Sequence, residues 1–233
     1  MPRGFSPNAG AVRLRKRLER AAGACTLIAL VFGILLGGKP NFTNASKPPR
    51  GISDPGVALQ VVRNLVELDD ILGDAPSADR EVMRFKQYLD FGFIPSYTAL
   101  FVLLGVLLMR SEGWWRAAGI AAIITAVATG LFDVLEDLAI LQILDLPLSV
   151  TSPRMLNAIR SASFAKWTLF AVTVALLSIQ FFGRPRTRAV IGGLMLVSAA
   201  MVFYGLYDPR FLVWQAYGSG AALLGITALF LIG

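Results

Sequence analysis

The sequence contains no histidine and a single cysteine, Cys25, among its 233 residues. The missing histidine excludes histidine-based acid–base catalysis and serine–histidine–aspartate triads, and it removes the usual side-chain sensor of near-neutral pH. One cysteine cannot form an internal disulfide framework, and a zinc site would lack its common ligands. The sequence also has no HExxH, GxSxG or phosphate-loop motif, so neither a cofactor nor a metal is predicted.

Charged residues are scarce, whereas apolar residues are abundant. Hydrophobic residues make up 55% of the chain and charged residues 16%, and the mean hydropathy is +0.63. This composition is too apolar for an ordinary soluble domain and is typical of a polytopic membrane protein. The sequence therefore predicts an all-α bundle of about six transmembrane helices, with membrane lipid as its surroundings.

The apolar runs divide the chain into four parts. These are a basic cytoplasmic tail (1–20), a first transmembrane helix (21–38), an extracytoplasmic segment (39–77) and a bundle of five further spans (78–233), with spans at about 90–109, 117–144, 158–182, 189–207 and 212–232. A cleaved signal peptide is the competing interpretation of the first run. Because no A-x-A site follows it, an uncleaved anchor is favoured.

The net charge of +7 reflects membrane orientation rather than nucleic-acid binding. Basic residues gather before the first apolar run and in alternate loops: Arg3, Arg13, Arg15, Lys16, Arg17, Arg20, Arg110, Arg116, Arg184, Arg186 and Arg188. The positive-inside rule places these residues, and with them both termini, in the cytoplasm. Arginine outnumbers lysine by 17 to 5, which is typical of a GC-rich bacterium. We therefore expect a location in the bacterial inner (plasma) membrane.

The extracytoplasmic segment carries the signals of one amphipathic helix. Asp54 is predicted to cap it, with Pro55 at its first position and Gly73 at its end. Its apolar face consists of Val57, Val61, Leu65, Leu68 and Leu72. Such a helix would lie on the outer membrane surface or over the bundle, either as simple packing or as a lid over a site.

The second and third spans each depart from a simple apolar helix. Pro95 removes a backbone donor and crowds the carbonyl of Phe91, which predicts a kink near Gly92. The kink could be an ordinary transmembrane one or could shape a pocket. The third run, Ala117 to Leu144, would be ~42 Å long as a helix, against a hydrocarbon thickness of ~30 Å. The sequence therefore does not fix how deep in the bilayer its polar residues lie.

Three carboxylates occupy one turn near the outer end of the third span. Asp133, Glu136 and Asp137 have i, i+3, i+4 spacing and project from one face of a helix. Because they repel one another in a partly apolar setting, they require cations, a ligand or bound protons. We expect Asp133 or Glu136 to pair with Lys166, and Asp137 to pair with Arg160.

The outer ends of spans two to four thus form one candidate site. Its members are Asp90, Tyr97, Asp133, Glu136, Asp137, Arg160 and Lys166. The site can cross-link the bundle at a wet interface, bind a small amphiphile or lipid, or serve an enzyme with Asp133 and Glu136 as acid and base. A proton-coupled transporter is a further alternative, although only span two has the broken helix that transporters have in both halves. The oligomeric state is open.

Three segments carry a resemblance: LDFGFIPSYTALF, FDVLEDLAIL and SASFAKWTLF. The residues that match are Asp90, Phe93, Ile94, Tyr97, Asp133, Glu136, Asp137, Lys166 and Trp167. This pattern resembles six-span bacterial membrane proteins with no assigned activity, in which an Asp-led Phe-Ile-x-x-Tyr segment precedes a D-x-x-E-D/N helix and a Lys-Trp/Phe helix. The resemblance implies a shared site on spans two to four and no particular chemistry.

Overall fold

The computed structural model describes residues 9–43, 49–182 and 186–232. Over these residues, six helices are long and apolar enough to cross a membrane: α1 (Ala9–Gly37), α4 (Ala78–Met109), α5 (Trp114–Leu144), α6 (Pro153–Ser178), α7 (Arg186–Gly205) and α8 (Arg210–Thr227). A 3₁₀ turn, Ile179–Phe181, prolongs α6, and a π-helical turn, Ala228–Ile232, prolongs α8. The predicted all-α fold with six spans is confirmed.

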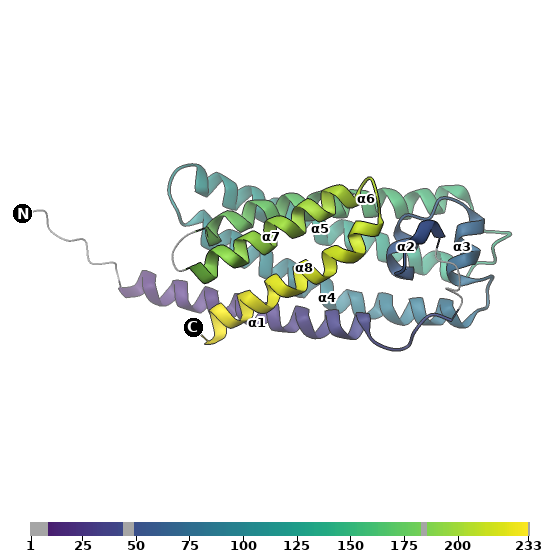
Figure 1. Cartoon of the computed structure of the whole chain (residues 1–233), viewed down its shortest axis with the longest axis horizontal. Coiled ribbons are helices and arrows are strands. Elements are labelled where there is room, and N and C mark those ends of the chain that lie inside the picture. Colours follow the sequence, from purple (N-terminus) through teal and green to yellow (C-terminus); the bar gives the residue numbers. More distant parts are fainter. Residues whose placement is uncertain (1–8, 44–48, 183–185, 233) are drawn as a thin grey trace, which may run out of the picture.

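The six long helices close into a ring that follows the order of the chain. Each helix packs against the next, and α8 packs back against α1. Consecutive long helices run in opposite directions, so α1 begins at the end of the bundle where α8 finishes (Figure 1). α1 begins at Ala9, so the basic residues from Arg13 to Arg20 belong to the same continuous helix as the first span. The first eight residues of the predicted tail, and Arg184, lie outside the described residues.

The segment between α1 and α4 contains two short helices, α2 (Pro55–Gln60) and α3 (Leu65–Leu72), so the prediction of one continuous helix is wrong. The break arises because the Asn64 side chain accepts a hydrogen bond from the backbone N–H three residues later (2.9 Å) and starts a new helix. Asp54 caps α2 in the same way, and Gly73 follows α3, as predicted.

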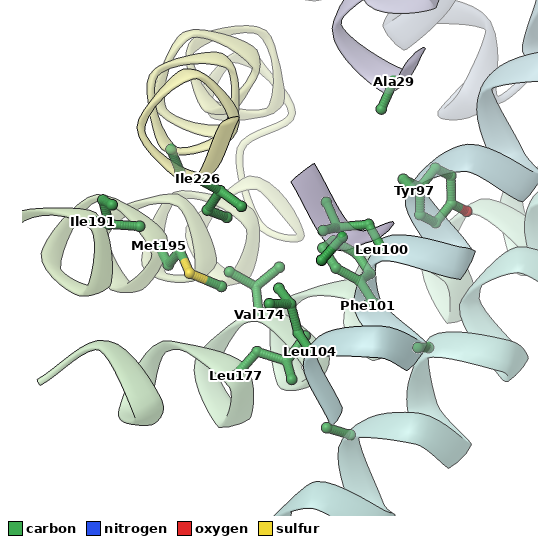
Figure 2. Packing of buried hydrophobic residues seen from close by; sticks show 14 of the residues in the cluster. Ala29, Tyr97, Leu100, Phe101, Leu104, Val174, Leu177, Ile191, Met195 and Ile226 are labelled. Carbon is green, nitrogen blue, oxygen red and sulfur yellow. The ribbon is translucent and has the colours of Figure 1, made fainter. Parts of the chain in front are cut away.

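Two apolar cores are stacked along the bundle. The inner core joins the membrane-spanning helices and includes Ala29, Tyr97, Leu100, Phe101, Leu104, Val174, Leu177, Ile191, Met195 and Ile226 (Figure 2). The outer core joins α2 and α3 to one end of α4, α5 and α6, and includes Leu59, Leu68, Leu72, Met83, Ile140, Ile143, Leu156 and Ile159. The segment therefore lies over the bundle, one of the two positions that the sequence predicts.

The helices α4, α5 and α6 extend beyond α7 and α8 at the end that α2 and α3 cover (Figure 1). They contain 32, 31 and 26 residues, whereas α7 and α8 contain 20 and 18. The turn between α7 and α8 reaches only the middle of α6, where Gly205 and Leu212 line a groove with Ser163 and Trp167. A helix as long as α5 spans ~46 Å, which exceeds the ~30 Å thickness of a bilayer core.

Pro95 lies inside α4 without breaking it, because the helix is continuous from Ala78 to Met109. The predicted bend near Gly92 remains a prediction. Gly92 has another role in the packing of α1 on α4. A Cβ atom there would lie 2.3 Å from Cζ of Phe32, so any larger residue would require this aromatic ring to move.

Two cationic side chains of α4 bind the carboxyl ends of neighbouring helices. Arg80, which is 1% exposed, donates through Nη1 to the carbonyls of Ile143 (2.8 Å) and Leu146 (2.9 Å) at the end of α5. Lys86 Nζ donates to the carbonyl of Gly38 (3.1 Å) at the end of α1. The last carbonyls of a helix lack partners within it and attract positive charge. These contacts therefore fasten α1 and α5 to α4.

Replacing Arg80 with leucine should lower the free energy of unfolding by about 1–3 kcal/mol, because buried carbonyls lose their donors. Arg84→Leu is the matched control, since Arg84 pairs with Asp145, whose side chain is 73% exposed. Its loss should be only about 0–1 kcal/mol. Thermal unfolding in detergent measures both, and equal losses would contradict the capping role of Arg80.

Candidate functional site

A polar layer separates the two apolar cores. It is formed by side chains at one height on α4, α5 and α6: Gln87, Asp90, Asp133, Glu136, Asp137, Ser163 and Lys166. Asp133, Glu136, Asp137 and Lys166 are all between 0% and 5% exposed. The layer is therefore enclosed by protein, which weighs against the interpretation of these charges as a wet interfacial cross-link.

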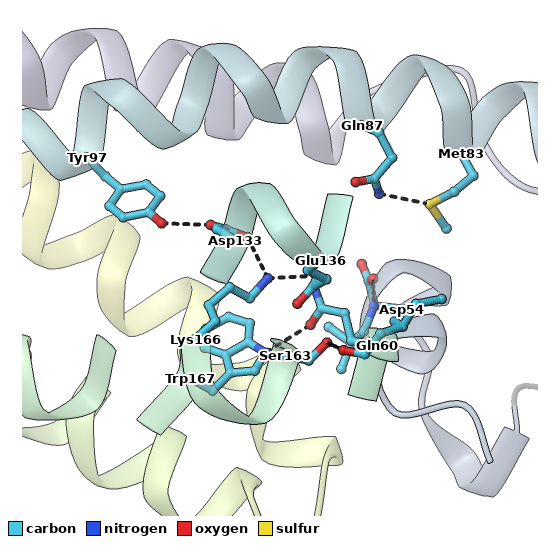
Figure 3. Close-up of polar contacts among 12 residues, drawn as sticks. Asp54, Gln60, Met83, Gln87, Tyr97, Asp133, Glu136, Ser163, Lys166 and Trp167 are labelled. Atoms are coloured by element: carbon cyan, nitrogen blue, oxygen red, sulfur yellow. Dashed lines mark hydrogen bonds and ion pairs between the residues drawn. The ribbon is translucent and has the colours of Figure 1, made fainter. Parts of the chain in front are cut away.

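Lys166 bridges two carboxylates of α5. Its Nζ atom lies 2.8 Å from Asp133 Oδ1 and 2.8 Å from Glu136 Oε1 (Figure 3). The two acidic residues are three positions apart, so both side chains leave the same face of α5. The predicted pairing of Lys166 with one of them is confirmed, and the lysine binds both at once.

Asp133 also connects this pair to α4. The Tyr97 hydroxyl donates to Asp133 Oδ2 at 2.7 Å (Figure 3). Because Asp133 Oδ1 accepts from Lys166, each oxygen of this carboxylate binds a different helix. Asp133 thus joins α4, α5 and α6.

The predicted pair of Asp137 with Arg160 is wrong. Arg160 is exposed, and its Nη1 donates to Asn157 at 3.3 Å. Six residues separate Arg160 from Lys166, so the two side chains point about 120° apart around α6. Since Lys166 faces α5, the Arg160 side chain points away from α5 and from Asp137. In the part of the chain that the structure describes, no hydrogen bond reaches either oxygen of Asp137.

A cavity of about 580 Å³ lies against the inner side of the polar layer. Asp90, Asp133 and Lys166 stand at its charged end. Aromatic rings of α4 and α6 form one wall, with centroid distances of 5.2 Å for Phe93–Tyr97, 5.7 Å for Tyr97–Phe101, 5.7 Å for Phe101–Phe170 and 5.8 Å for Trp167–Phe170. The cavity is thus largely apolar, with ionisable groups at one end.

Residues that the sequence did not single out complete the cavity. Gln60 of α2 accepts a hydrogen bond from Trp167 Nε1 (2.9 Å), which ties α2 to the charged end of the cavity. On the opposite wall, Ser198 Oγ and Ser219 Oγ lie 2.7 Å apart, and Gln215 donates to Ser219 at 2.5 Å. Isolated serines and glutamines in apolar helices carry no spacing signal, so only the fold brings them together.

The cavity opens sideways between α1 and α8. These helices meet at Gly23, where a Cβ atom would lie 2.8 Å from the side chain of Leu231. They separate toward the polar layer (Figure 1), and there Ile34 of α1 and Tyr217 of α8 line the cavity. These two side chains are 73% and 72% exposed. The opening therefore faces the surroundings of the bundle, which for membrane-spanning helices is lipid.

The fold and the polar layer define a multi-pass α-helical membrane protein with an enclosed charge cluster beside a laterally open cavity. The chain matches no family model, no curated protein and no solved structure.

Removing Lys166 should be costly because it leaves buried carboxylates without their cation. Lys166→Met should lower the free energy of unfolding by about 3–5 kcal/mol, and adding Asp133→Asn should restore part of it. Arg160→Met removes an exposed charge from the same helix and should cost about 0–1 kcal/mol. Thermal unfolding in detergent of the single and double variants is the measurement. Strict additivity of Lys166→Met and Asp133→Asn would show that the two residues are not coupled.

Proposed function

We propose that this protein binds a small amphiphile or lipid, which enters from the bilayer between α1 and α8. The observation that carries the proposal is the cavity itself, which is apolar for most of its length, charged at one end and open at its side. Its volume of about 580 Å³ falls within the range of ~300–1,000 Å³ that small-molecule sites occupy.

The cavity suits a molecule with two unlike ends. An apolar tail would lie along the aromatic wall, where burial contributes roughly 25 cal/mol for each Å² removed from water. A polar head would lie at Asp90, Asp133 and Lys166, which offer both acceptors and a donor. Acid–base catalysis by Asp133 and Glu136 fits less well. Both carboxylates bind the same ammonium, and of the two only Asp133 lines the cavity.

The positive-inside rule supports an orientation for this site. The basic residues near the beginning of α1 would be cytoplasmic, and α2 and α3 would lie outside. Asp133 follows the interfacial Trp114 by about 19 residues, or ~28 Å of helix, close to the hydrocarbon thickness of ~30 Å. The polar head would then lie at the outer edge of the hydrocarbon layer, in a bacterial plasma membrane.

Filling the cavity should displace the amphiphile without unfolding the protein. A Cβ atom at Gly33 or Gly220 meets nothing within 4 Å, and both glycines line the cavity. Gly33→Leu and Gly220→Leu should therefore fit, and leucine should also favour the helix by up to about 1 kcal/mol. Native mass spectrometry of lipid retained after purification should show reduced occupancy in both variants.

Gly193→Leu is the matched control for the cavity variants. Gly193 of α7 also has nothing within 4 Å of a Cβ atom, but it lies away from the cavity lining. This variant should retain as much lipid as the wild type. Equal occupancy in all three leucine variants would contradict the proposed site.

The orientation is tested by labelling single cysteines in a Cys25→Ala background. Asp70 on α3 and Thr187 at the beginning of α7 are both exposed. In intact cells, an impermeant thiol reagent should label Asp70→Cys, and it should label Thr187→Cys only after lysis. Labelling of Thr187→Cys in intact cells would contradict this orientation and indicate the opposite one.

A further inference from the structure

Asp137 is a fully buried carboxylate of the polar layer that neither Lys166 nor Tyr97 binds. It is 0% exposed, and within the described residues neither of its oxygens accepts a hydrogen bond. Glu136, at 1% exposed, likewise has an unpartnered oxygen, Oε2. Buried polar groups are almost always paired with protein, ordered water or an ion. These oxygens are therefore available to bind a further partner, such as a cation.

The oxygens around Asp137 are spaced for a common ion. One carboxylate oxygen from each of Asp90, Asp133 and Asp137 lies within 4.8 Å of the others. Oxygens that bind one calcium ion lie 2.3–2.6 Å from it, so two of them are at most ~5 Å apart. The three carboxylates come from two helices, α4 and α5, that are held together by the hydrogen bond from Tyr97 to Asp133.

The charge balance of the layer indicates the same partner. Asp90, Asp133, Glu136 and Asp137 gather around one ammonium group, that of Lys166, among the described residues of the layer. If all are ionised, about three negative charges remain uncompensated in a largely enclosed setting. Uncompensated buried charge is strongly unfavourable. A divalent cation would remove most of the excess.

We propose that Asp90, Asp133 and Asp137 bind a hard divalent cation such as calcium. The donors are all carboxylate oxygens, which suit calcium, magnesium or manganese rather than the softer metals that histidine and cysteine bind. Asp90 and Asp133 line the cavity, so the ion has a route to the site. This proposal departs from the sequence-based expectation of no metal, and it does not depend on the amphiphile.

Calcium binding to the full-length protein in detergent tests the proposal. The protein is stripped with chelator, the chelator is removed, and calcium chloride is titrated by isothermal calorimetry while the thermal midpoint is recorded. The wild type should bind one calcium per chain and unfold at a higher temperature. Asp137→Asn should bind at least roughly tenfold more weakly. Asp70→Asn removes an exposed carboxylate of α3 and should bind as the wild type does.

Two results would overturn the proposal. One is that calcium, magnesium and manganese all fail to bind the wild type. The other is that Asp137→Asn binds calcium as tightly as the wild type, because the ion is then held at other acidic groups. If Asp137→Asn does not fold, Asp90→Asn takes its place, since Asp90 is only half-buried. Gly33→Leu should bind calcium as the wild type does. A failure of calcium binding can therefore be distinguished from a failure of amphiphile binding.

Discussion

The ammonium of Lys166, held between Asp133 and Glu136, is the contact on which the outer half of this protein depends. Each of these groups alone would be an unpaired charge in an enclosed site, which costs several kcal/mol. Together they require α5 and α6 to meet at one height, and the hydrogen bond from Tyr97 adds α4 to the same level. We infer that the polar layer sets the register of the three helices, because apolar cores on both sides would tolerate small shifts.

The two sides of the bundle differ in how deeply their helices are buried. The most apolar stretches of α4, α5, α6 and α7 are 39–44% buried, whereas those of α1 and α8 are only 22% and 17% buried. No ion pair of the polar layer reaches α1 or α8 among the described residues. The cavity opens between these two weakly packed helices. The less buried side is the one through which the proposed amphiphile would enter from the bilayer.

The sequence predicts the spans well because a continuous run of about 20 apolar residues marks a membrane-spanning helix by itself. It also predicts the capping by Asp54 and the pairing of Lys166, since helical spacing places Asp133 and Glu136 on one face. The partner assigned to Asp137 was wrong because height along the membrane says nothing about rotation around a helix axis. Arg160 lies ~9 Å from Lys166 along α6 and points away from α5. The caps made by Arg80 and Lys86 depend on helix ends meeting in space, which no local pattern encodes.

The cavity is the part of the account that depends most on three-dimensional packing, because its lining comes from six helices and from Gln60 of α2. An electron cryomicroscopy map of the wild-type protein in nanodiscs made with native lipid tests it most directly. The account predicts an elongated density that enters between α1 and α8 and ends beside Asp133 and Lys166. A map in which α1 closes against α8 along its whole length, with side chains filling the space, would contradict it.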